Sequence, residues 1–464
     1  MARSRFKLRG RTPPEQEIIL SEAPLPRSEA AAEPDTPPPG PLDAGPPVQL
    51  PGAPPRPAAA PLPRGAFAAL RHRNFRLFYA GQLLSLVGTW MQSTAQGWLV
   101  LELTDSALLL GMVTAAGSLP VLLFTLYAGV LADRVDKRRV IVAAQAGAAA
   151  VALALAVLTD TGHATVHRIL ALVFLLGTAN AFEIPTRQSF FVELVGQEDL
   201  TSAIGLNSSA FSASRVVGPA LAGALLGTVG VAACFYLNAV SYLAVIAGLL
   251  LIRLPPFRRP ERTASTLANL REGFAFIRGD RLVRTLVWTI AALSVFGFPY
   301  AMLLPVFARD VLGVGAQGLG WLLAASGSGA LVGGIALSAL ASRVPRGRLV
   351  LLASFSFALL VGAFAASRSF ALSLLLLAGA GFCMILNNGC VNTLLQSLVP
   401  DRLRGRVMSV YVFMFLGMAP LGSLQAGALA RWAGAPAALG AGAAALALVV
   451  LGVAWKVPEL GELR

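Results

Sequence analysis

Charged residues are scarce in this sequence. Of its 464 residues, only 13% are Asp, Glu, Lys or Arg, whereas ordinary soluble domains carry about a quarter. Hydrophobic residues make up 56% of the chain, and its mean hydropathy is +0.70. A chain this poor in charge has too little polar surface for water, so the composition excludes an ordinary soluble protein and predicts an integral membrane protein.

Cysteine and histidine are equally rare, with three of each. The cysteines fall in apolar runs without paired spacing and the histidines are dispersed, so we expect neither a disulfide nor a metal site. The sequence shows no nucleophile–base pair and no phosphate-binding loop, and we therefore expect neither an enzyme nor a cofactor. The cysteines are Cys234, Cys383 and Cys390, and the histidines are His72, His163 and His167.

Long apolar runs are what the sequence does contain. Each is about 20 residues long, which is enough to cross a hydrocarbon core of about 30 Å as a helix. The runs are apolar on every side and lack the alternation of membrane barrel strands, so we expect an all-α membrane protein. The twelve predicted transmembrane helices cover 75–101, 106–131, 138–158, 168–192, 202–227, 231–252, 285–307, 317–341, 348–366, 370–398, 405–430 and 434–456.

Basic residues lie almost entirely on one side of this predicted bundle. With the N-terminus in the cytoplasm, 32 of the 37 Lys and Arg residues fall on cytoplasmic segments or helix ends, and only Arg215 lies deep inside a helix. The positive-inside rule then predicts a multi-pass protein of a bacterial cytoplasmic membrane with both termini in the cytoplasm. Because the net charge of +14 follows the topology instead of forming a patch, we expect no nucleic-acid partner.

An internal repeat divides the chain into two pseudo-symmetric halves. The segments GVLADRVDKRRVIV from Gly129 and SALASRVPRGRLVL from Ser338 share five residues at an offset of 209, and the helix from Gly177 aligns with that from Gly381 at an offset of 204. The predicted organisation is a disordered, Pro/Ala-rich cytoplasmic tail at 1–64, six-helix bundles at 65–254 and 285–456, a cytoplasmic linker with an amphipathic helix at 255–284, and a cytoplasmic tail at 457–464.

The first copy of the repeated loop resembles a known signature. Its sequence, GVLADRVDKRR, is similar to the loop between helices two and three of major facilitator superfamily transporters, except that Asp136 stands where the family usually has Gly. The resemblance implies a cytoplasmic gate, in which the acid lies at the N-terminus of helix eleven and the basic residues bind an acid that ends helix four. The implied gate residues are Gly129, Asp133, Arg134, Lys137, Arg138 and Glu193. The alternative is that these charges only obey the positive-inside rule.

Helix five carries a second motif. Its segment RVVGPALAG resembles the Gly-Pro motif of superfamily exporters, with Gly218, Pro219 and Gly223 at the motif positions. Small residues at this spacing let another helix approach closely, and proline can bend the helix. Together with NAFEIPTRQSFFVEL and PDRLRGRVMS, the segment is similar to the branch that contains the enterobactin exporter and macrolide efflux proteins, of the transmembrane secretion effector type. The alternative is ordinary small-residue packing.

Two ionisable residues are predicted to lie deep in the membrane. Arg215 lies about 18 Å along helix five, and Glu183 lies about 22 Å from the outer end of helix four. Burial favours the neutral form of a carboxylate, so a deep acid can take up and release protons. Glu183 and Arg215 are therefore the candidates for proton coupling. An equally open alternative is a structural ion pair between Glu183 and Arg187, one turn apart.

These features predict a secondary active transporter that exports small amphipathic or hydrophobic molecules, such as drugs, siderophores or secondary metabolites, by alternating access and proton antiport. Its partners would be the small-molecule substrate, protons and the lipid bilayer, and we expect a monomer. Polar residues in apolar helices are the candidates for the substrate cavity, namely Gln92, Asn180, Asn387 and Asn388. The alternatives are a nutrient uptake transporter, or a transporter-like receptor or scaffold that no longer cycles, against which the intact loop signature counts.

Overall fold

The computed structural model describes residues 65–253 and 266–463. The predicted tail at 1–64 and the first part of the predicted linker therefore lie outside the described residues. Inside the described ranges, no side-chain description extends to residues 125, 126, 128–134, 266–270 and 338. Three predicted gate residues, Gly129, Asp133 and Arg134, belong to this last group.

The described chain is helical, with no strand in either range. Four short segments complete it: η1 (Ala68–Arg71) and η4 (Pro458–Glu462) are 3-10 helices, whereas η2 (Leu293–Gly297) and η3 (Phe307–Val311) are π-helical. The α-helices are α1 (Arg73–Thr104), α2 (Ala107–Arg134), α3 (Lys137–Asp160), α4 (Val166–Val195), α5 (Leu200–Thr228), α6 (Val231–Leu251), α7 (Thr266–Gly279), α8 (Arg281–Ala292), α9 (Pro299–Val306), α10 (Gly315–Arg343), α11 (Arg346–Ala366), α12 (Phe370–Leu398), α13 (Asp401–Gly417), α14 (Ala419–Ala433) and α15 (Ala435–Lys456).

Eleven helical spans of the described chain are long and apolar enough to cross a membrane. Helix α1 is not one of them, although it has 32 residues, because polar side chains recur along it. Gln82, Ser85, Gln92 and Thr94 are all buried against the rest of the protein, so α1 keeps these groups away from lipid, where an unsatisfied polar group is costly. With α1 as the remaining span, the predicted all-α fold of twelve transmembrane helices is confirmed.

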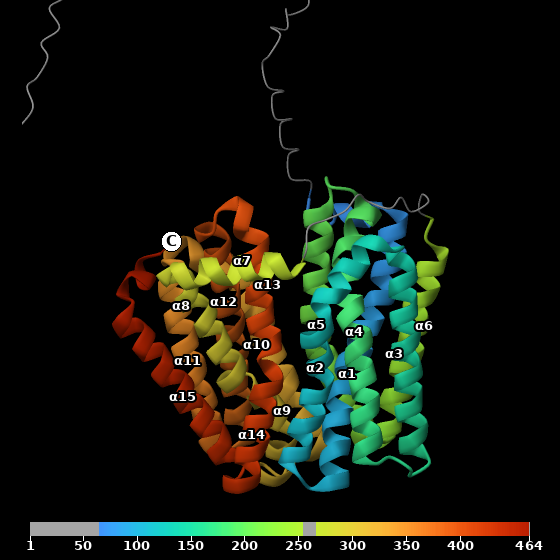
Figure 1. The fold of residues 1–464 in the computed structure, drawn as a ribbon. Coiled ribbons are helices and arrows are strands. Elements are labelled where there is room, and N and C mark those ends of the chain that lie inside the picture. Colours follow the sequence, from blue (N-terminus) through green and yellow to red (C-terminus); the bar gives the residue numbers. More distant parts are fainter. Residues whose placement is uncertain (1–64, 254–265, 464) are drawn as a thin grey trace, which may run out of the picture. The chain divides into compact units, whose positions relative to one another are not determined.

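The spans form two bundles of similar construction (Figure 1). In the first, α1 packs against α5 and α6, α2 against α4, and α3 against α4 and α6; in the second, α10 packs against α12, and α11 against α12 and α15. The bundles meet most extensively through two helix pairs, α5 with α10 and α2 with α14, and α13 and α9 of the second bundle also contact α2. Each pair joins the second span of one bundle to the fifth span of the other, as a pseudo-symmetric arrangement requires.

The first and last segments of the described chain, η1 and η4, lie at the same end of the two bundles. Segment η1 contacts the start of α5, where the Ala69 backbone N–H donates to Ser202 Oγ at 3.1 Å. Segment η4 contacts the start of α11, where the Gly347 N–H donates to the Leu463 carbonyl at 3.0 Å. We call this end, which also carries the α2–α3 and α4–α5 turns, the terminal face, and the other end the opposite face.

Two spans of the second bundle are interrupted, which differs from the continuous helices predicted at 285–307 and 405–430. The first is built from α8, η2, α9 and η3, and the second divides into α13 and α14 at Met418. Prolines lie at each interruption, with Pro299 opening α9 and Pro420 near the start of α14. Because proline has no N–H, it leaves one carbonyl of the preceding turn without its helical partner.

The interruptions pack against each other inside the second bundle. Ser294, in η2, donates its hydroxyl to the Phe415 carbonyl at 2.7 Å. Gly422, in α14, approaches so closely that a Cβ at this position would lie 2.8 Å from the carbonyl oxygens of Ser294 and Val295. Non-helical backbone at membrane depth is tolerated where protein surrounds it, and these contacts provide that surrounding.

Candidate functional site

The predicted gate region lies on the terminal face. Lys137, at the start of α3, contacts Glu193, near the end of α4, with 2.6 Å between Nζ and Oε1. Arg138 instead donates to the Leu250 carbonyl at 2.9 Å. Asp136 accepts from the backbone N–H groups of Arg138 and Arg139, so it caps α3. The departure from glycine at this position therefore has a local use, since an Asp at a helix N-terminus satisfies free N–H groups.

Glu183 lies on α4 and is buried, with 7% of its surface exposed. Its Oε1 lies 2.8 Å from Nε of Arg187, one turn further along α4. The two atoms are not aligned as a hydrogen bond, and each lacks a hydrogen-bond partner. Arg187 also donates from Nη1 to Asn207 Oδ1 on α5, at 3.1 Å. The ion pair considered from the sequence is thus present, and a role of Glu183 in proton coupling stays a prediction.

Arg215 lies in the middle of α5, where the two bundles meet. Its Nη2 contacts the Met384 sulfur, on α12 of the second bundle, at 3.8 Å. Its guanidinium carbon lies over the Trp90 ring of α1, 5.7 Å from the centroid, which is within the range of a cation–π contact. The side chain therefore reaches from the first bundle to the second at mid-depth.

The four predicted cavity residues fall into two groups. Gln92 is buried on α1 and accepts from Asn238 of α6 at 2.7 Å, while Asn387 is buried on α12 and accepts from Ser354 of α11 at 3.0 Å. In both, the amide nitrogen has no partner. Asn180 and Asn388 are only half-buried. Whether any of the four touches a substrate stays a prediction.

Sequence reasoning missed Asn238 and Ser354, the partners of Gln92 and Asn387. Each is a polar residue in an otherwise apolar predicted helix, which is the same signal that singled out Gln92 and Asn387. Hydropathy along the chain does not show which polar residues pair across helices, so these two partners were not predicted.

The motif on α5 lies at close helix contacts. A Cβ at Gly218 would lie 2.6 Å from Cβ of Trp90, on α1, and one at Gly223 would lie 3.0 Å from the Gln317 carbonyl and the Gly320 Cα, on α10. Small residues at these two positions therefore let α5 approach α1 within its own bundle and α10 across the interface. Pro219 is buried inside an unbroken α5.

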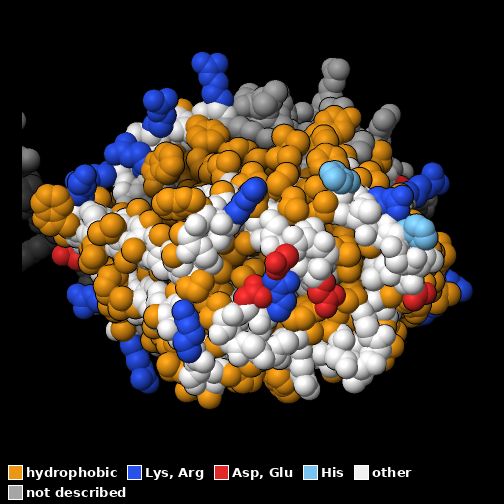
Figure 2. All heavy atoms as spheres, turned by 90° about the horizontal axis from the view of Figure 1, so that it is seen from below, with side chains coloured by type: hydrophobic (Ala, Val, Ile, Leu, Met, Phe, Trp, Pro, Cys, Tyr) orange, Lys and Arg blue, Asp and Glu red, His pale blue; other side chains and the backbone are white. Residues whose placement is uncertain are grey.

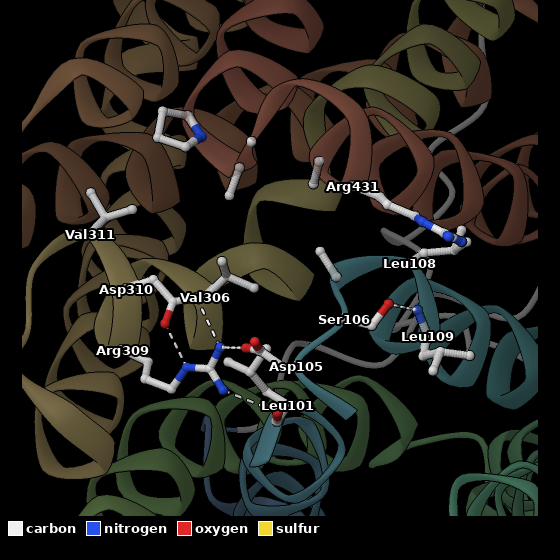
Figure 3. A pocket seen from close by; sticks show the side chains of 15 residues that line it. Leu101, Asp105, Ser106, Leu108, Leu109, Val306, Arg309, Asp310, Val311 and Arg431 are labelled. Carbon is white, nitrogen blue, oxygen red and sulfur yellow. Dashed lines mark hydrogen bonds and ion pairs between the residues drawn. The ribbon is translucent and has the colours of Figure 1, made fainter. Parts of the chain in front are cut away.

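The opposite face carries an ionic link between the bundles that the sequence did not single out. Figure 2 shows this face, where acidic and basic side chains lie together near the middle. Arg309, in η3 of the second bundle, forms an ion pair with Asp105 and donates to the Leu101 carbonyl at 3.1 Å, both in the first bundle (Figure 3). Asp310, next to Arg309, pairs with the same guanidinium at 2.6 Å. Asp105 and Arg309 are 204 residues apart, so no local pattern could reveal the link.

A cavity of about 720 Å³ opens beside this link, and both bundles line it. Asp105 has φ of 48°, the left-handed conformation that Asp and Asn tolerate better than other residues with a Cβ. Because the turn before α2 is fixed in this way, the Asp105 carboxylate is directed at Arg309 (Figure 3).

Contacts between the bundles are concentrated between the opposite face and mid-depth. Near the opposite face, a Cβ at Gly111 of α2 would lie 2.5 Å from the Ser423 carbonyl of α14, and at mid-depth Gly327 of α10 lies against the Arg215 carbonyl. Nearer the terminal face, a Cβ at Gly205 of α5 would meet nothing within 4 Å.

The ion pairs of the terminal face show the same pattern. Lys137 and Glu193 both belong to the first bundle, whereas Glu272 and Arg406, and likewise Arg281 and Glu459, belong to the second bundle and the α7 helix packed on it. Among the described residues, the ion pair that reaches from one bundle to the other therefore lies on the opposite face, and these ion pairs of the terminal face stay within one bundle.

Comparison with known proteins agrees with this architecture. Residues 64–463 match the family described as transmembrane secretion effector. The chain is 29% identical to the multidrug efflux pump Tap of Mycolicibacterium fortuitum over 81% of this chain and 93% of that protein. It is 26% identical to the staphyloferrin A transporter of Staphylococcus aureus over 75% of this chain and 87% of that protein.

Among solved structures, the fold is similar to that of a bacterial homologue of the human lysosomal transporter Spinster in an inward-facing, unoccupied conformation. The TM-score is 0.63 at 15% identity, and the match covers 85% of this chain and 96% of that one. With the family match extending over both bundles, this chain is a multi-pass membrane protein that belongs to the transmembrane secretion effector family of major facilitator transporters.

Proposed function

We propose that the protein exports small amphipathic or hydrophobic molecules across a bacterial cytoplasmic membrane by alternating access. The observation that carries this proposal is the asymmetric contact between the bundles: among the described residues, close glycine contacts and an ion pair join them from the opposite face to mid-depth, whereas the ion pairs described on the terminal face lie within one bundle. Two bundles that pack on one side of a central site are arranged as a rocking transporter requires. The name of one relative, the multidrug efflux pump Tap, supports export.

The orientation follows from charge. The segments assigned to the terminal face carry most of the basic residues, so the positive-inside rule places that face in the cytoplasm. This distribution of contacts supports a state open to the cytoplasm, in which an exporter takes up its cargo.

Cysteine labelling tests this orientation. Cysteines introduced at Thr161 of the opposite face and at Gly279 of the terminal face lie at exposed positions, while the three native cysteines are buried. In intact cells an impermeant maleimide should label Thr161→Cys and leave Gly279→Cys unlabelled until the cells are opened. The reverse pattern would overturn the orientation.

Proton antiport is the proposed source of energy. Glu183 is a buried acid at membrane depth, and uptake of a proton would remove the charge that holds Arg187 and free that residue to change partners. In the other state, Asp133 would meet the N-terminus of α13 and join the bundles on the terminal face, beside the charge network of Arg134, Lys137, Arg138 and Glu193.

Transport by purified protein decides between the alternatives. In proteoliposomes with an imposed proton gradient, an exporter should move a fluorescent amphiphile from the side of the terminal face to the side of the opposite face. Movement in the other direction would favour nutrient uptake. Saturable binding of the amphiphile without movement, by protein that elutes as a folded species, would favour a receptor or scaffold.

A further inference from the structure

Among the described residues, no acidic side chain forms an ion pair with Arg215. Its contacts are the Trp90 ring and the Met384 sulfur, and the nearby buried ion pair joins Glu183 to Arg187 instead. The facing spans of the second bundle offer no acid, because the sequence contains neither Asp nor Glu from Val311 to Pro400. Arginine stays protonated in proteins, so the charge persists at a depth where it is costly unless an anion or water meets it.

The surroundings of Arg215 suit one kind of anion. Trp90 lies under the guanidinium and meets Phe211, one turn before Arg215 on α5, edge to face with 5.6 Å between ring centroids. Phe211 is 45% exposed and lies on the side of Arg215 toward the terminal face, where the bundles part. An aromatic surface beside a fixed cation fits a molecule that has both an apolar body and a negative group.

A hydrogen-bond donor lies on the helix that Arg215 reaches. Asn387 is fully buried, and its amide nitrogen has no partner. It follows Met384 by three residues on α12, so the two side chains occupy neighbouring positions on one face of that helix. This amide can donate to an anion, whereas the described residues place no carboxylate here.

We infer that the exported molecules are amphipathic anions, and that Arg215 binds their carboxylate or a similar acidic group while Trp90 and Phe211 contact the apolar part. This inference rests on the proposed function and deepens it by naming the charge of the substrate. It also gives Arg215 a role other than proton transfer. A guanidinium stays charged, so it binds the acidic group of the substrate without taking up or releasing a proton.

Two dyes on one ring system test the inference. Fluorescein is an anion at neutral pH, whereas rhodamine 123 has the same xanthene core and is a cation. Binding of each to the full chain in nanodiscs would be measured by fluorescence anisotropy for the unmodified protein and for Arg215→Gln, Arg215→Lys and Arg168→Gln. Arg168 lies on the opposite face with its guanidinium bonded to the His163 carbonyl, so its variant controls for the loss of one positive charge.

The unmodified protein should bind fluorescein more tightly than rhodamine 123. Arg215→Gln should weaken fluorescein binding by at least about tenfold, which is the usual loss for one charge-assisted hydrogen bond, and should leave rhodamine 123 binding unchanged or stronger. Arg215→Lys should retain part of the preference, because the charge remains without the planar fork, and Arg168→Gln should match the unmodified protein.

Equal weakening of both dyes by Arg215→Gln, in protein that still elutes as a folded species, would overturn the inference. So would stronger binding of rhodamine 123 by the unmodified protein, or the lack of saturable fluorescein binding. A transport measurement distinguishes failure of the anion preference from failure of the proposed export function. If proteoliposomes carry rhodamine 123 in the export direction while fluorescein is neither bound nor moved, export stands and the anion preference is wrong.

Discussion

At the scale of single residues, the sequence could indicate pairs connected by helical spacing or by the motif it resembles, but not those that the packing of the two bundles creates. Glu183 and Arg187 are four residues apart on one helix, so their contact could be foreseen from helical spacing. Lys137 and Glu193 could be matched because one is the loop base and the other the acid that ends the next helix but one. The contact of Arg309 with Asp105 depends on how two bundles pack, and charge counts alone assign both residues to outer loops.

The first prediction concerns Glu183, the acid of the buried ion pair. We expect Glu183→Gln to abolish accumulation of substrate against its gradient and to leave binding and downhill movement unchanged, because the amide keeps the shape and loses the titratable proton. The measurement is dye transport in proteoliposomes with and without a proton gradient. The repeat counterpart of Glu183 is Asn387, which supports tolerance of an amide at this position.

A control distinguishes coupling from folding. Arg187→Gln leaves the carboxylate in place without its partner, so it should lower the amount of folded protein more than Glu183→Gln does, since an unpaired buried charge is costly. If Glu183→Gln pumps normally and is only less abundant, the pair is structural and proton coupling belongs to another group.

At the scale of elements, the twelve spans and their repeat could be predicted because they depend on local hydropathy, whereas the interruptions could not. Pro299 and Pro305 do signal irregularity between 285 and 307, but the place and type of a break depend on the packing around it. Here the break in one span packs on the break in the other, and the Ser294 hydroxyl donates to the Phe415 carbonyl, close to the break at Met418. The first bundle has no such break in its corresponding helices, because α1 and α5 are continuous.

The second prediction concerns the packing of these breaks. We expect Gly422→Ala to lower the free energy of unfolding by about 1–3 kcal/mol, the usual cost of overpacking, because its Cβ would lie 2.8 Å from two carbonyl oxygens. The measurement is thermal unfolding of detergent-solubilised protein. Gly440→Ala in α15 is the matched control, since a Cβ there meets nothing within 4 Å, and it should be neutral or slightly stabilising. Equal stability of the two variants would show that η2 and α14 can move apart to admit the new methyl group without lowering the free energy of unfolding.

At the scale of the whole molecule, two bundles could be inferred from the repeat, but the described arrangement could not, because under the proposed alternating access one sequence adopts two states. The contacts on the opposite face favour the described state. The close approach of Gly111 to the Ser423 carbonyl and of Gly223 to Gly320 occurs in this arrangement, as does the Arg309 link to Asp105. In the proposed cycle, opening that face would break all of these while the gate region closes.

The last prediction uses the ionic link to bias this equilibrium. Asp105→Asn removes the charge that joins the bundles while keeping a residue that tolerates the left-handed backbone at φ of 48°. Asp310→Asn removes the other charge on Arg309, which lies within the same bundle as Arg309, and serves as the control. Because the Asp105 side chain is 83% exposed and that of Arg309 28% exposed, the link contributes only about 0.2–1 kcal/mol.

A loss of that size should shift the ratio of the two states by a factor of about 1.4 to 5, and only in the Asp105→Asn variant. Spin labels at Thr161 in the first bundle and Trp432 in the second, both exposed on the opposite face, report the separation of the bundles by pulsed electron resonance. The fraction of long distances should rise for Asp105→Asn and stay at the unmodified value for Asp310→Asn. If both variants raise it equally, the relevant quantity is the total charge around Arg309, and the bundles are held by the glycine contacts alone.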